Sequence, residues 1–426
     1  MNLKLNWLSS IAFLSLSSAL LIGCGGSDKP AEGDNNSAST GKTEGGDNTS
    51  GGKRPASEGN VVASGDTIKI GFIGSLTGDE KPWGDDSKDG AQLAVDQFNA
   101  AGGLNGKKVE MVIGDSASKA EAAKTASEKV LSEGVIAIVG EVASGNTIQI
   151  ANSAFPKGVP VMAVGATRTD LTDIGNNVFR VCYNDDFQGP LMAQFAYDQG
   201  VKNIAVLTDN KLPYSQALSA AFKAKFESLG GKVVGEEFYE KGATQFNGQI
   251  TNLKAKNPDG LFLSGYFTEV GPIAKAAKDG GLAVKMFGGD GWDSPQILAS
   301  GGDAIIGGFF CNHYTNTDTR AQVVEFLKAW RANHGGKVPG TTMGALGYDA
   351  MALTLDALKR AGKAESQAVL KAIDETENYA GVSGDITLKG QGGNPKKRAL
   401  VVQVTAKDAE GNFQKLAKEY QPGDLK

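Results

Sequence analysis

"TIKIGFIG" (residues 67–74) is the stretch from which the fold of this chain can be built outward. It is a short run rich in β-branched and aromatic residues that ends at a glycine. A helical pattern follows over Ser87–Ala101, and a second apolar run, "KVEMVIGD" (108–115), comes next. Strand, helix and strand in this order form a βαβ unit with two parallel strands. The stretch therefore predicts the first strand of a parallel sheet.

The same alternation continues for most of the chain. Two further apolar runs, "VIAIVG" (135–140) and "VPVMAV" (159–164), complete a first block. A second block contains "NIAVLTD" (203–209), "KVVGEEFY" (232–239), "GLFLSG" (260–265) and "VKMFGG" (284–289). Helical patterns between the runs cover 118–132, 146–155, 214–229, 246–256 and 269–279. Nearly continuous apolar strands indicate sheets covered on both faces, so we predict an α/β fold of two doubly wound parallel-sheet lobes.

The rhythm changes after Cys311. Helical patterns at 319–334 and 343–361 have no strand between them, and "DITL" (385–388) and "ALVVQV" (399–404) follow. These helices complete the first lobe if the last strands return to the second, which requires three crossings and a hinge. The crossings are expected near 180–183, 310–312 and 383–385. The predicted limits are 66–181 plus 312–383 for lobe 1, and 182–311 plus 384–426 for lobe 2.

The N-terminal segment has the pattern of an export signal. Lys4 precedes an apolar run over Trp7–Ile22 that is too weak and short for an ordinary spanning helix. Leu21-Ile22-Gly23-Cys24 resembles the lipobox of bacterial lipoproteins, in which the cysteine becomes the lipid-bearing N-terminus. The alternative is an ordinary signal peptide with an unrelated cysteine. Residues 25–60 contain no large apolar or aromatic side chain, so we predict a signal peptide at 1–23 and a lipidated Cys24 with a disordered tether at 24–65.

Composition excludes several classes of function. The net charge is −5 and no basic cluster with interleaved aromatic residues occurs, so nucleic acid is a poor partner. His313 and His334 are the two histidines, and neither stands in a zinc-binding spacing. Nucleophile-elbow and phosphate-loop motifs are also lacking. We therefore expect no metal, no cofactor and no catalysed reaction.

Ligands in open α/β sheets bind at the carboxyl ends of the strands. Ser144, Gly165 and Thr167 follow strand runs of the first block, and Tyr266 and Asp290 follow runs of the second. The first set supplies hydroxyl groups and the N-terminus of a helix, which attracts a carboxylate. The second set supplies an acid and an aromatic ring. A zwitterion such as an amino acid fits both sets.

Each of these residues also has a plain structural explanation. Ser144 is expected to cap the helix after it, and Thr167 is a common cap or turn residue. Tyr266 is compatible with simple packing at a strand end, and Asp290 in "GGDGWD" with a turn. Trp83 in "KPWG" is compatible with covering a loop.

From about Thr67 to Lys415 the chain resembles the branched-chain amino acid (Leu/Ile/Val) group of type I periplasmic binding proteins, the solute receptors of ABC importers. The stretches that carry the resemblance occur in order along the body. They are residues 70–115, "GVPVMAVGATRTDLT" (158–172), "FRVCYNDDFQG" (179–189) and "LFLSGYFTEVGPIAKAAKDGGL" (261–282).

The resemblance assigns roles to individual residues. Ser144 matches a carboxylate-binding serine, and Gly165 and Thr167 match groups that hold the carboxylate and the ammonium. Tyr266 and Asp290 match the tyrosine and acid that meet the ammonium, although the family acid is often a glutamate. The remaining matches are two aromatic residues of the pocket wall, Trp83 and Tyr214.

Cys182 and Cys311 remain after Cys24. On the residues alone, a disulfide and two free buried thiols are equally compatible with an exported protein. Because the family places the two crossing segments side by side, the resemblance implies a Cys182–Cys311 disulfide.

The function implied by the resemblance is that of an extracytoplasmic solute-binding lipoprotein. It would bind a branched-chain or related neutral amino acid between two closing lobes and deliver it to ABC permease and ATPase subunits. We expect a monomer held to a bacterial membrane by its lipid. The alternative is a sensor component for amino acids, amides or small organic acids.

Lipidation of Cys24 can be tested by substitution. Cys24→Ser removes the thiol that carries the acyl chains, so the protein should move from the membrane fraction to the soluble fraction, because the chains are its expected membrane contact. Sedimentation followed by immunoblotting measures this shift. A variant that still sediments with membranes would show that the anchor prediction is wrong.

Overall fold

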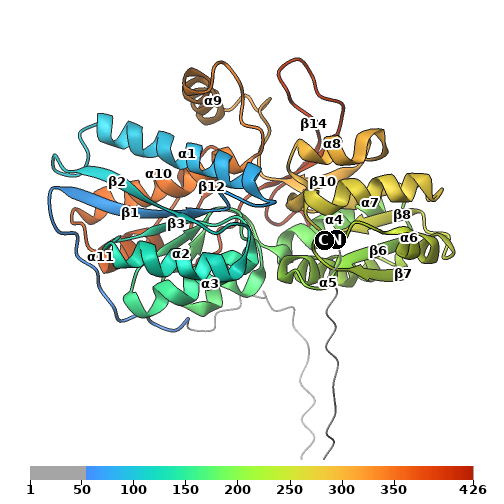
Figure 1. The fold of residues 1–426 in the computed structure, drawn as a ribbon, viewed down its shortest axis with the longest axis horizontal. Coiled ribbons are helices and arrows are strands. Elements are labelled where there is room, and N and C mark those ends of the chain that lie inside the picture. Colours follow the sequence, from blue (N-terminus) through green and yellow to red (C-terminus); the bar gives the residue numbers. More distant parts are fainter. Residues whose placement is uncertain (1–53, 426) are drawn as a thin grey trace, which may run out of the picture. The chain divides into compact units, whose positions relative to one another are not determined.

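The computed structural model describes residues 54–425, and its first sheet is built around the stretch 67–74 (Figure 1). Ile68, Ile70 and Phe72 of this stretch have no exposed surface. The five strands are parallel and lie in the order β2-β1-β3-β4-β5. They are β1 (Thr67–Gly74), β2 (Lys108–Asp115), β3 (Ile138–Gly140), β4 (Val161–Ala163) and β5 (Val178–Arg180). Chain order reverses at β1, so the carboxyl ends of β1 and β3 open at a topological switch point.

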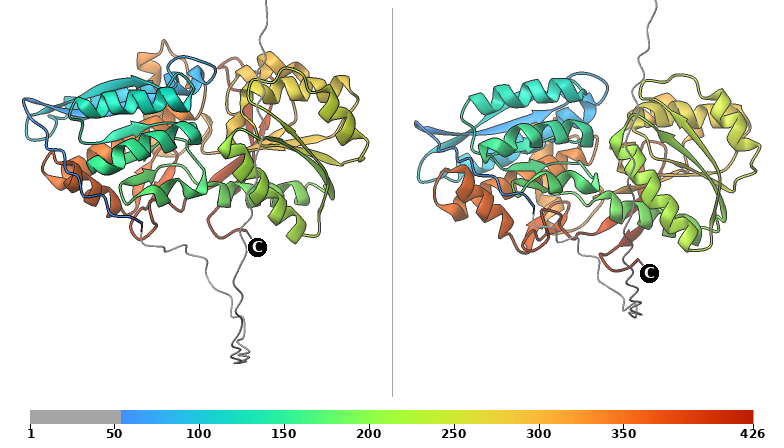
Figure 2. Two further views of the ribbon diagram at one scale, coloured as in Figure 1. Left: turned by 60° about the horizontal axis from the view of Figure 1, so that its bottom comes forward. Right: turned by 90° about the horizontal axis from the view of Figure 1, so that it is seen from below.

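Helices cover both faces of this sheet (Figures 1 and 2). On one face α1 (Lys81–Ala100) packs against α10 (Met343–Ala361), with α11 (Ser366–Asp374) beside α10. On the other face α2 (Ala120–Ser132) packs against α3 (Ser144–Ala154). The short 3₁₀ helices η1 (Phe155–Lys157) and η2 (Thr169–Ile174) follow α3 and β4.

The contact between α1 and α10 depends on glycine. A Cβ atom on Gly90 of α1 would lie 2.0 Å from the carbonyl oxygen of Gly344 in α10. A Cβ atom on Gly347 of α10 would lie 2.2 Å from the carbonyl oxygen of Ser87. The backbones of the two helices are therefore in direct contact. This contact places α10 on the face of the first sheet, although α10 lies far from that sheet's strands in the sequence.

The second sheet has seven strands in the order β14-β13-β10-β9-β8-β6-β7. The parallel strands are β6 (Asn203–Asp209), β7 (Lys232–Tyr239), β8 (Gly260–Leu263), β9 (Lys285–Gly288) and β10 (Phe309–Asn312). β13 (Ala399–Val404) and β14 (Gln414–Tyr420) add to one edge as antiparallel strands. The helices around this sheet are α4 (Asp185–Asp198), α5 (Pro213–Ser228), α6 (Asn247–Lys254), α7 (Phe267–Asp279) and α8 (Gln296–Gly301), with η3 (Asp290–Trp292) and η4 (Gly302–Ala304).

The chain passes between the sheets where strand membership changes. It leaves the first sheet after β5, returns after β10 through α9 (Ala321–Asn333), and leaves again after the small antiparallel pair β11 (Tyr379–Gly381) and β12 (Gly384–Ile386). The predicted α/β fold with parallel sheets is confirmed. The predicted lobe limits and the hinge stay predictions.

Some elements differ from the sequence expectations. The elements that were not predicted are β5, β10, β11, β14, α4, α8 and α11. The strand expected at 385–388 corresponds to β12, which pairs with β11 and not with the second sheet, and the two last strands of the second sheet are antiparallel. In α4 the buried residues lie on several sides and Pro190 stands inside the helix, so the sequence has no clear helical period. α1 begins at Lys81 rather than Ser87, because Pro82 occupies a first-turn position where its missing N–H costs nothing.

The last part of the predicted tether lies against the body. Arg54 donates from Nη1 to the carbonyl of Val178 at 2.8 Å and lies over the ring of Phe179. The Ser57 hydroxyl donates to the carbonyl of Phe155 at 2.6 Å, and the Ala63 amide donates to the carbonyl of Ala364 at 2.9 Å. These residues are held by hydrogen bonds to backbone carbonyls, and Val61 packs partly buried against the core. The absence of large apolar side chains extends only over residues 25–60, so it does not describe Val61.

The predicted signal peptide (1–23), the lipid site Cys24 and the tether residues 24–53 lie outside the described residues. Within 54–425, no helix has both the length and the apolar character needed to cross a membrane.

The backbone contact at Gly90 makes a prediction about stability. Gly90→Ala should destabilise the protein by about 1–3 kcal/mol although alanine favours helices, because its methyl group would overlap α10. Gly248→Ala is the matched control, since Gly248 lies in α6 with no atom within 4 Å of its Cβ position. That change should stabilise by up to about 1 kcal/mol. Urea unfolding of both variants measures the difference, and equal stabilities would contradict the close contact.

Candidate functional site

A small cavity lies between the carboxyl ends of strands from both sheets. It contains about 210 Å³ of empty space and is lined by Trp83, Val142, Ser144, Gly165, Tyr214, Tyr266, Asp290, Gly291 and Met343. The structure thus brings together every predicted ligand-binding residue except Thr167. Sequence analysis missed Val142, Gly291 and Met343. Met343 begins α10, far from any strand end, so the strand-end rule could not find it.

Asp290 forms the polar floor of this cavity and is almost fully buried. It lies directly after β9, at the start of η3. Its Oδ1 atom accepts hydrogen bonds from the Tyr214 hydroxyl at 3.0 Å and the Gln188 amide at 3.1 Å. Its Oδ2 atom lies 3.1 Å from Nε2 of His313. A carboxylate has about four acceptor positions, so three side-chain partners leave capacity for one more donor.

Two of these partners were not predicted. Gln188 lies in α4, and its side-chain amide also donates to Asp185 at 2.7 Å. His313 directly follows β10, and no metal-binding spacing in the sequence singles it out. The hydrogen bonds of Gln188 and His313 to Asp290 join residues that are far apart in the sequence, so no local sequence pattern predicts them.

Thr167 lies behind the cavity wall. Its hydroxyl accepts a hydrogen bond from the Gln188 amide at 3.4 Å, and its carbonyl accepts one from the Asp185 amide at 2.9 Å. Burial raises the pKa of Asp185 to about 7, with hydrogen bonding from Gln188 acting in the opposite direction. Thr167 is therefore connected to Asp290 through Gln188 rather than being a lining residue.

Ser144 does not cap α3 as expected. Ala143 is the N-cap residue, and Ser144 is the first residue of the helix. The Ser144 hydroxyl instead accepts a hydrogen bond from the Arg168 amide at 3.3 Å, which joins the start of α3 to the loop after β4. The cavity therefore has the N-terminus of α3 on the side of the first sheet and the Asp290 carboxylate on the side of the second.

Three aromatic rings form the wall between these two ends. The Trp83 ring meets the Tyr266 ring edge to face at 4.8 Å, and the Tyr214 ring lies 5.2 Å from Tyr266. Trp83 also donates from Nε1 to the carbonyl of Asp293 at 2.7 Å. Because α1 packs on the first sheet and Asp293 follows β9 of the second, this bond connects the two halves across the cavity.

A buried acidic network lies beside the wall. Glu141 accepts hydrogen bonds from the Ser75 and Ser116 hydroxyls at 2.5 and 2.7 Å, and Ser75 also contacts Glu80. Lys241, from the loop after β7, forms an ion pair with Glu80 at 2.5 Å. Burial raises the pKa of Glu80 to about 7, while Lys241 acts in the opposite direction. This pair is a second polar link between the halves.

The predicted disulfide is wrong, because Cys182 and Cys311 are free buried thiols in the structure. The Cys182 thiol is directed to the carbonyl of Ala166 at 3.4 Å. Cys311 lies next to the Tyr183 hydroxyl. The two sulfur atoms therefore have separate partners although their segments both pass between the sheets.

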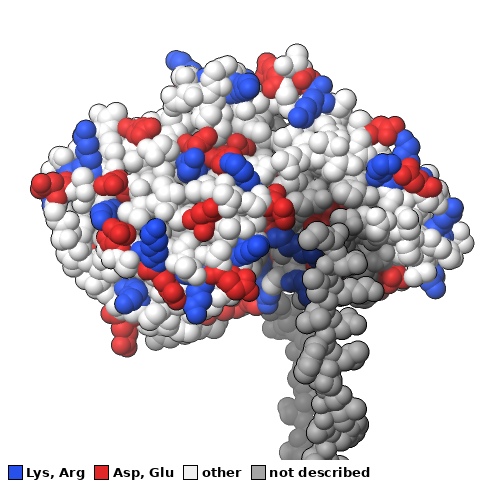
Figure 3. All heavy atoms as spheres, viewed as in Figure 1, with Lys and Arg blue, Asp and Glu red and all other residues white. Residues whose placement is uncertain are grey.

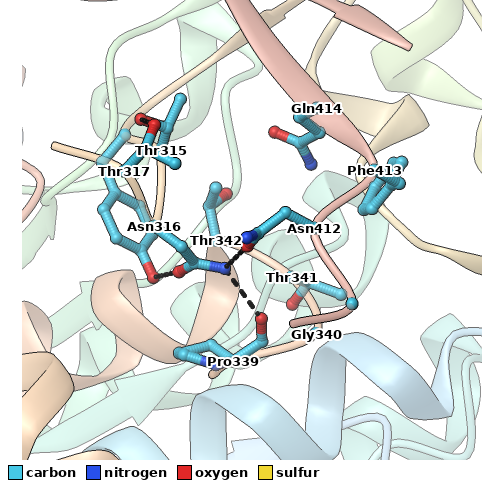
Figure 4. A pocket seen from close by; sticks show the side chains of 12 residues that line it. Thr315, Asn316, Thr317, Pro339, Gly340, Thr341, Thr342, Asn412, Phe413 and Gln414 are labelled. Atoms are coloured by element: carbon cyan, nitrogen blue, oxygen red, sulfur yellow. Dashed lines mark hydrogen bonds between the residues drawn. The ribbon is translucent and has the colours of Figure 1, made fainter. Parts of the chain in front are cut away.

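A second cavity, near the chain's passage after β10, is a weaker candidate (Figure 4). The Asn316 amide donates to the Pro339 carbonyl and to Asn412, and the Tyr314 hydroxyl donates to Asn316 (Figure 4). Its polar groups thus bind one another rather than a ligand.

On the face shown in Figure 3, acidic and basic side chains are interspersed rather than gathered by sign. Within residues 54–425, no cluster of three or more metal-ligating side chains is placed to hold an ion.

Comparisons with known proteins agree on one family. The family described as periplasmic binding protein matches residues 67–410. Leu/Ile/Val-binding protein homolog 1 of Brucella abortus is 30% identical over 348 residues, which are 81% of this chain and 92% of that protein.

Solved structures give the same result. A leucine-binding protein of Thermotoga maritima aligns with a TM-score of 0.79 and 32% identity, covering 84% of this chain and 100% of that one. A branched-chain amino acid transporter substrate-binding protein of Streptococcus pneumoniae, solved in complex with isoleucine, has a TM-score of 0.76 and 28% identity. It covers 83% of this chain and 99% of that one.

The free state of the Cys182 and Cys311 thiols can be tested by alkylation without reductant. In the folded protein Cys182 and Cys311 should resist a maleimide, because both are buried. After unfolding in guanidinium, peptides carrying either residue should be labelled fully. Mass spectrometry measures both states, and a linked pair of peptides that appears only without reductant would restore the disulfide.

Proposed function

This chain belongs to the periplasmic binding protein family, and on that premise we propose that it binds a neutral aliphatic α-amino acid, such as leucine, isoleucine or valine, for an ABC importer. The ligand would occupy the cavity at Asp290 without being chemically changed. The family assignment supports a solute-binding role, and the names of the relatives support this ligand class.

The observation that carries the proposal is the carboxylate of Asp290. Among the described residues no lysine or arginine forms an ion pair with it, and its one basic partner is His313. Burial lowers the pKa of His313, so the imidazole is neutral at neutral pH. A buried charge needs a partner. An ammonium group of a ligand supplies the missing cation.

Nearby buried cations are already engaged elsewhere. Arg180 donates to the carbonyls of Ala166 and Arg168, each at 2.7 Å. Lys397 donates to the carbonyl of Val181 at 2.8 Å and to the Ser383 hydroxyl at 2.6 Å. Both are buried and held by these acceptors, so neither is free to move to Asp290.

The opposite end of the cavity suits the ligand carboxylate. The N-terminus of α3 carries a partial positive charge, and Ser144 adds a hydroxyl at this point. The wall between the ends is apolar and aromatic, which suits an aliphatic side chain.

We propose the following roles for the predicted residues. Asp290, Tyr214, Tyr266 and the backbone carbonyl of Gly165 would receive the ammonium, and Ser144 the carboxylate. Trp83 would cover the side chain. Thr167 would act through Gln188, because it lies behind the wall rather than in it.

The contacts across the cavity support closure by hinge motion. The proposed lobes are 66–181 plus 312–383, and 182–311 plus 384–426. Trp83 and Glu80 belong to the first lobe, and their partners Asp293 and Lys241 to the second. The closed protein would dock on the permease and its ATPase as a monomer, held to the membrane by the lipid on Cys24.

Charge removal at Asp290 tests the ligand class. Asp290→Ala should weaken leucine binding roughly 30-fold or more, because the ammonium would be buried without a counter-charge. Asp290→Asn should also bind poorly, since it keeps the size but not the charge. Asp186→Asn is the matched control, because Asp186 is an aspartate that closely follows the chain's first passage between the sheets but is exposed to solvent.

Calorimetric titration with leucine, isoleucine and their deaminated analogues measures these affinities. The analogues should not distinguish wild type from Asp290→Asn. The amino-acid proposal fails if wild type binds only ligands that lack an ammonium group, or if Asp290→Asn binds leucine unchanged. An amide or a small organic acid would then be the better ligand class.

A further inference from the structure

His313 lies beneath the cavity, between two segments that pass from one sheet to the other. It follows β10 directly and has no exposed surface. Its ring stacks on the ring of Tyr183 at 4.0 Å with 17° between the planes, and Tyr183 belongs to the passage after β5. The imidazole is therefore fixed in one orientation, with one edge directed at Asp290.

The hydrogen bonds of the ring define its tautomer. Nε2 lies 3.1 Å from Oδ2 of Asp290, and a carboxylate can only accept, so the proton is assigned to Nε2. Nδ1 is buried and has no hydrogen-bond partner in the structure. A second proton on the ring would place an N–H donor at Nδ1 with no acceptor, which is costly in a protein interior.

The other charged and titratable groups around the ring are few. Lys397, on the third passage, opposes protonation of His313, whereas Asp290 favours it. Cys182 and Cys311 are neutral neighbours on the two other passages, and burial raises the pKa of Cys182 to about 12. Tyr183 is also neutral, because burial raises the pKa of its hydroxyl. Asp185 acts indirectly, through the Gln188 amide that it shares with Asp290.

We propose that His313 is a positioning residue for the ammonium-binding carboxylate, and that its protonation and the binding of an amino-acid ligand exclude one another. The neutral imidazole donates to Oδ2 of Asp290 and directs the remaining acceptor capacity of the carboxylate into the cavity. This inference rests on the proposed function, because it requires a ligand with an ammonium group.

The exclusion follows from charge. With a neutral imidazole, Asp290 keeps its negative charge for the ligand. When His313 gains a proton, the imidazolium becomes the counter-ion of Asp290, and a ligand ammonium would add a second cation to the same carboxylate. Burial lowers the pKa of His313 below its ordinary value, so this change falls on the acidic side of about pH 6.5. By linkage, bound ligand must lower the pKa of His313 further.

The first measurement is the pH profile of binding. Leucine is titrated calorimetrically into the full-length wild-type protein from about pH 8 to about pH 5. Affinity should be constant above neutral pH and should fall by up to about tenfold per pH unit once His313 begins to gain a proton. His313→Asn has no titrating group at this position, so this part of the slope should disappear.

A second variant separates His313 from Asp185. The pKa of Asp185 is raised to about 7 by burial, so this residue also gains a proton in the range of the titration. Asp185→Asn should keep the slope below about pH 6.5 if His313 causes it. His313→Phe keeps a ring to stack on Tyr183 but has no donor, and it should bind leucine roughly tenfold more weakly than wild type near pH 7.5.

The second measurement observes the imidazole directly. The chain contains two histidines, so NMR of protein with ¹⁵N-labelled histidine gives two ring systems, and His313→Asn assigns them. Saturating leucine should shift the titration of His313 to lower pH. His334, which contacts Asp89 at the partly exposed end of α9, gives the second ring signal and serves as the internal control.

The outcomes distinguish this inference from the proposed function. If wild type binds leucine but His313→Asn keeps the same pH slope, or leucine leaves the titration of His313 unchanged, the inference is overturned and the function stands. If wild type binds no amino acid at any pH, both are overturned.

Discussion

The carboxylate of Asp290 is the group on which the arrangement of this site depends. It is buried where the two sheets meet, and its side-chain partners come from α4, α5 and the end of β10. Those partners are neutral at neutral pH, so they orient the charge without balancing it. Removing a charge from water is costly unless a counter-charge arrives. If the lobes close as we propose, closure around a cation is favoured over closure around an empty site, which couples ligand occupancy to conformation.

Other contacts across the cavity are formed between residues of the protein itself. Because of them, closure would depend only partly on the ligand. Trp83 donates a hydrogen bond to the carbonyl of Asp293. The Asp293 carboxylate accepts hydrogen bonds from the amide and the hydroxyl of Thr342 at 2.6 and 2.7 Å. Lys241 pairs with the buried Glu80. These bonds would stabilise a closed form. The burial of two carboxyl groups, Asp293 and Glu80, would oppose the closed form. Burial raises the pKa of Asp293 to about 6 and that of Glu80 to about 7. Because the bonds and the burial of the carboxyl groups partly offset each other, ligand binding would decide whether the closed form is favoured.

The sequence predicts the parts of this structure that depend on local pattern. "TIKIGFIG" reads as a buried strand because nearly every side chain is apolar, and Ser144, Tyr266 and Asp290 are found because they follow such strands. His313 and Gln188 were missed because their importance comes from hydrogen bonds between distant segments, and a single histidine looks the same in the sequence whatever lies beside it. The cysteine pairing failed for a related reason. Adjacent segments do not determine where two thiols point, and Cys182 is directed to Ala166.

The acid itself shows how a shorter side chain can serve the same purpose. The family resemblance implies an acid that is often a glutamate, and Asp290 is one methylene shorter. The structure holds both oxygens of the shorter acid in place, because Tyr214 and Gln188 donate to Oδ1 and His313 lies at Oδ2. A glutamate in the same place would either lose these donors or occupy part of this small cavity. The shorter acid and its buried histidine therefore form one arrangement, and neither residue can be understood from the sequence without the other.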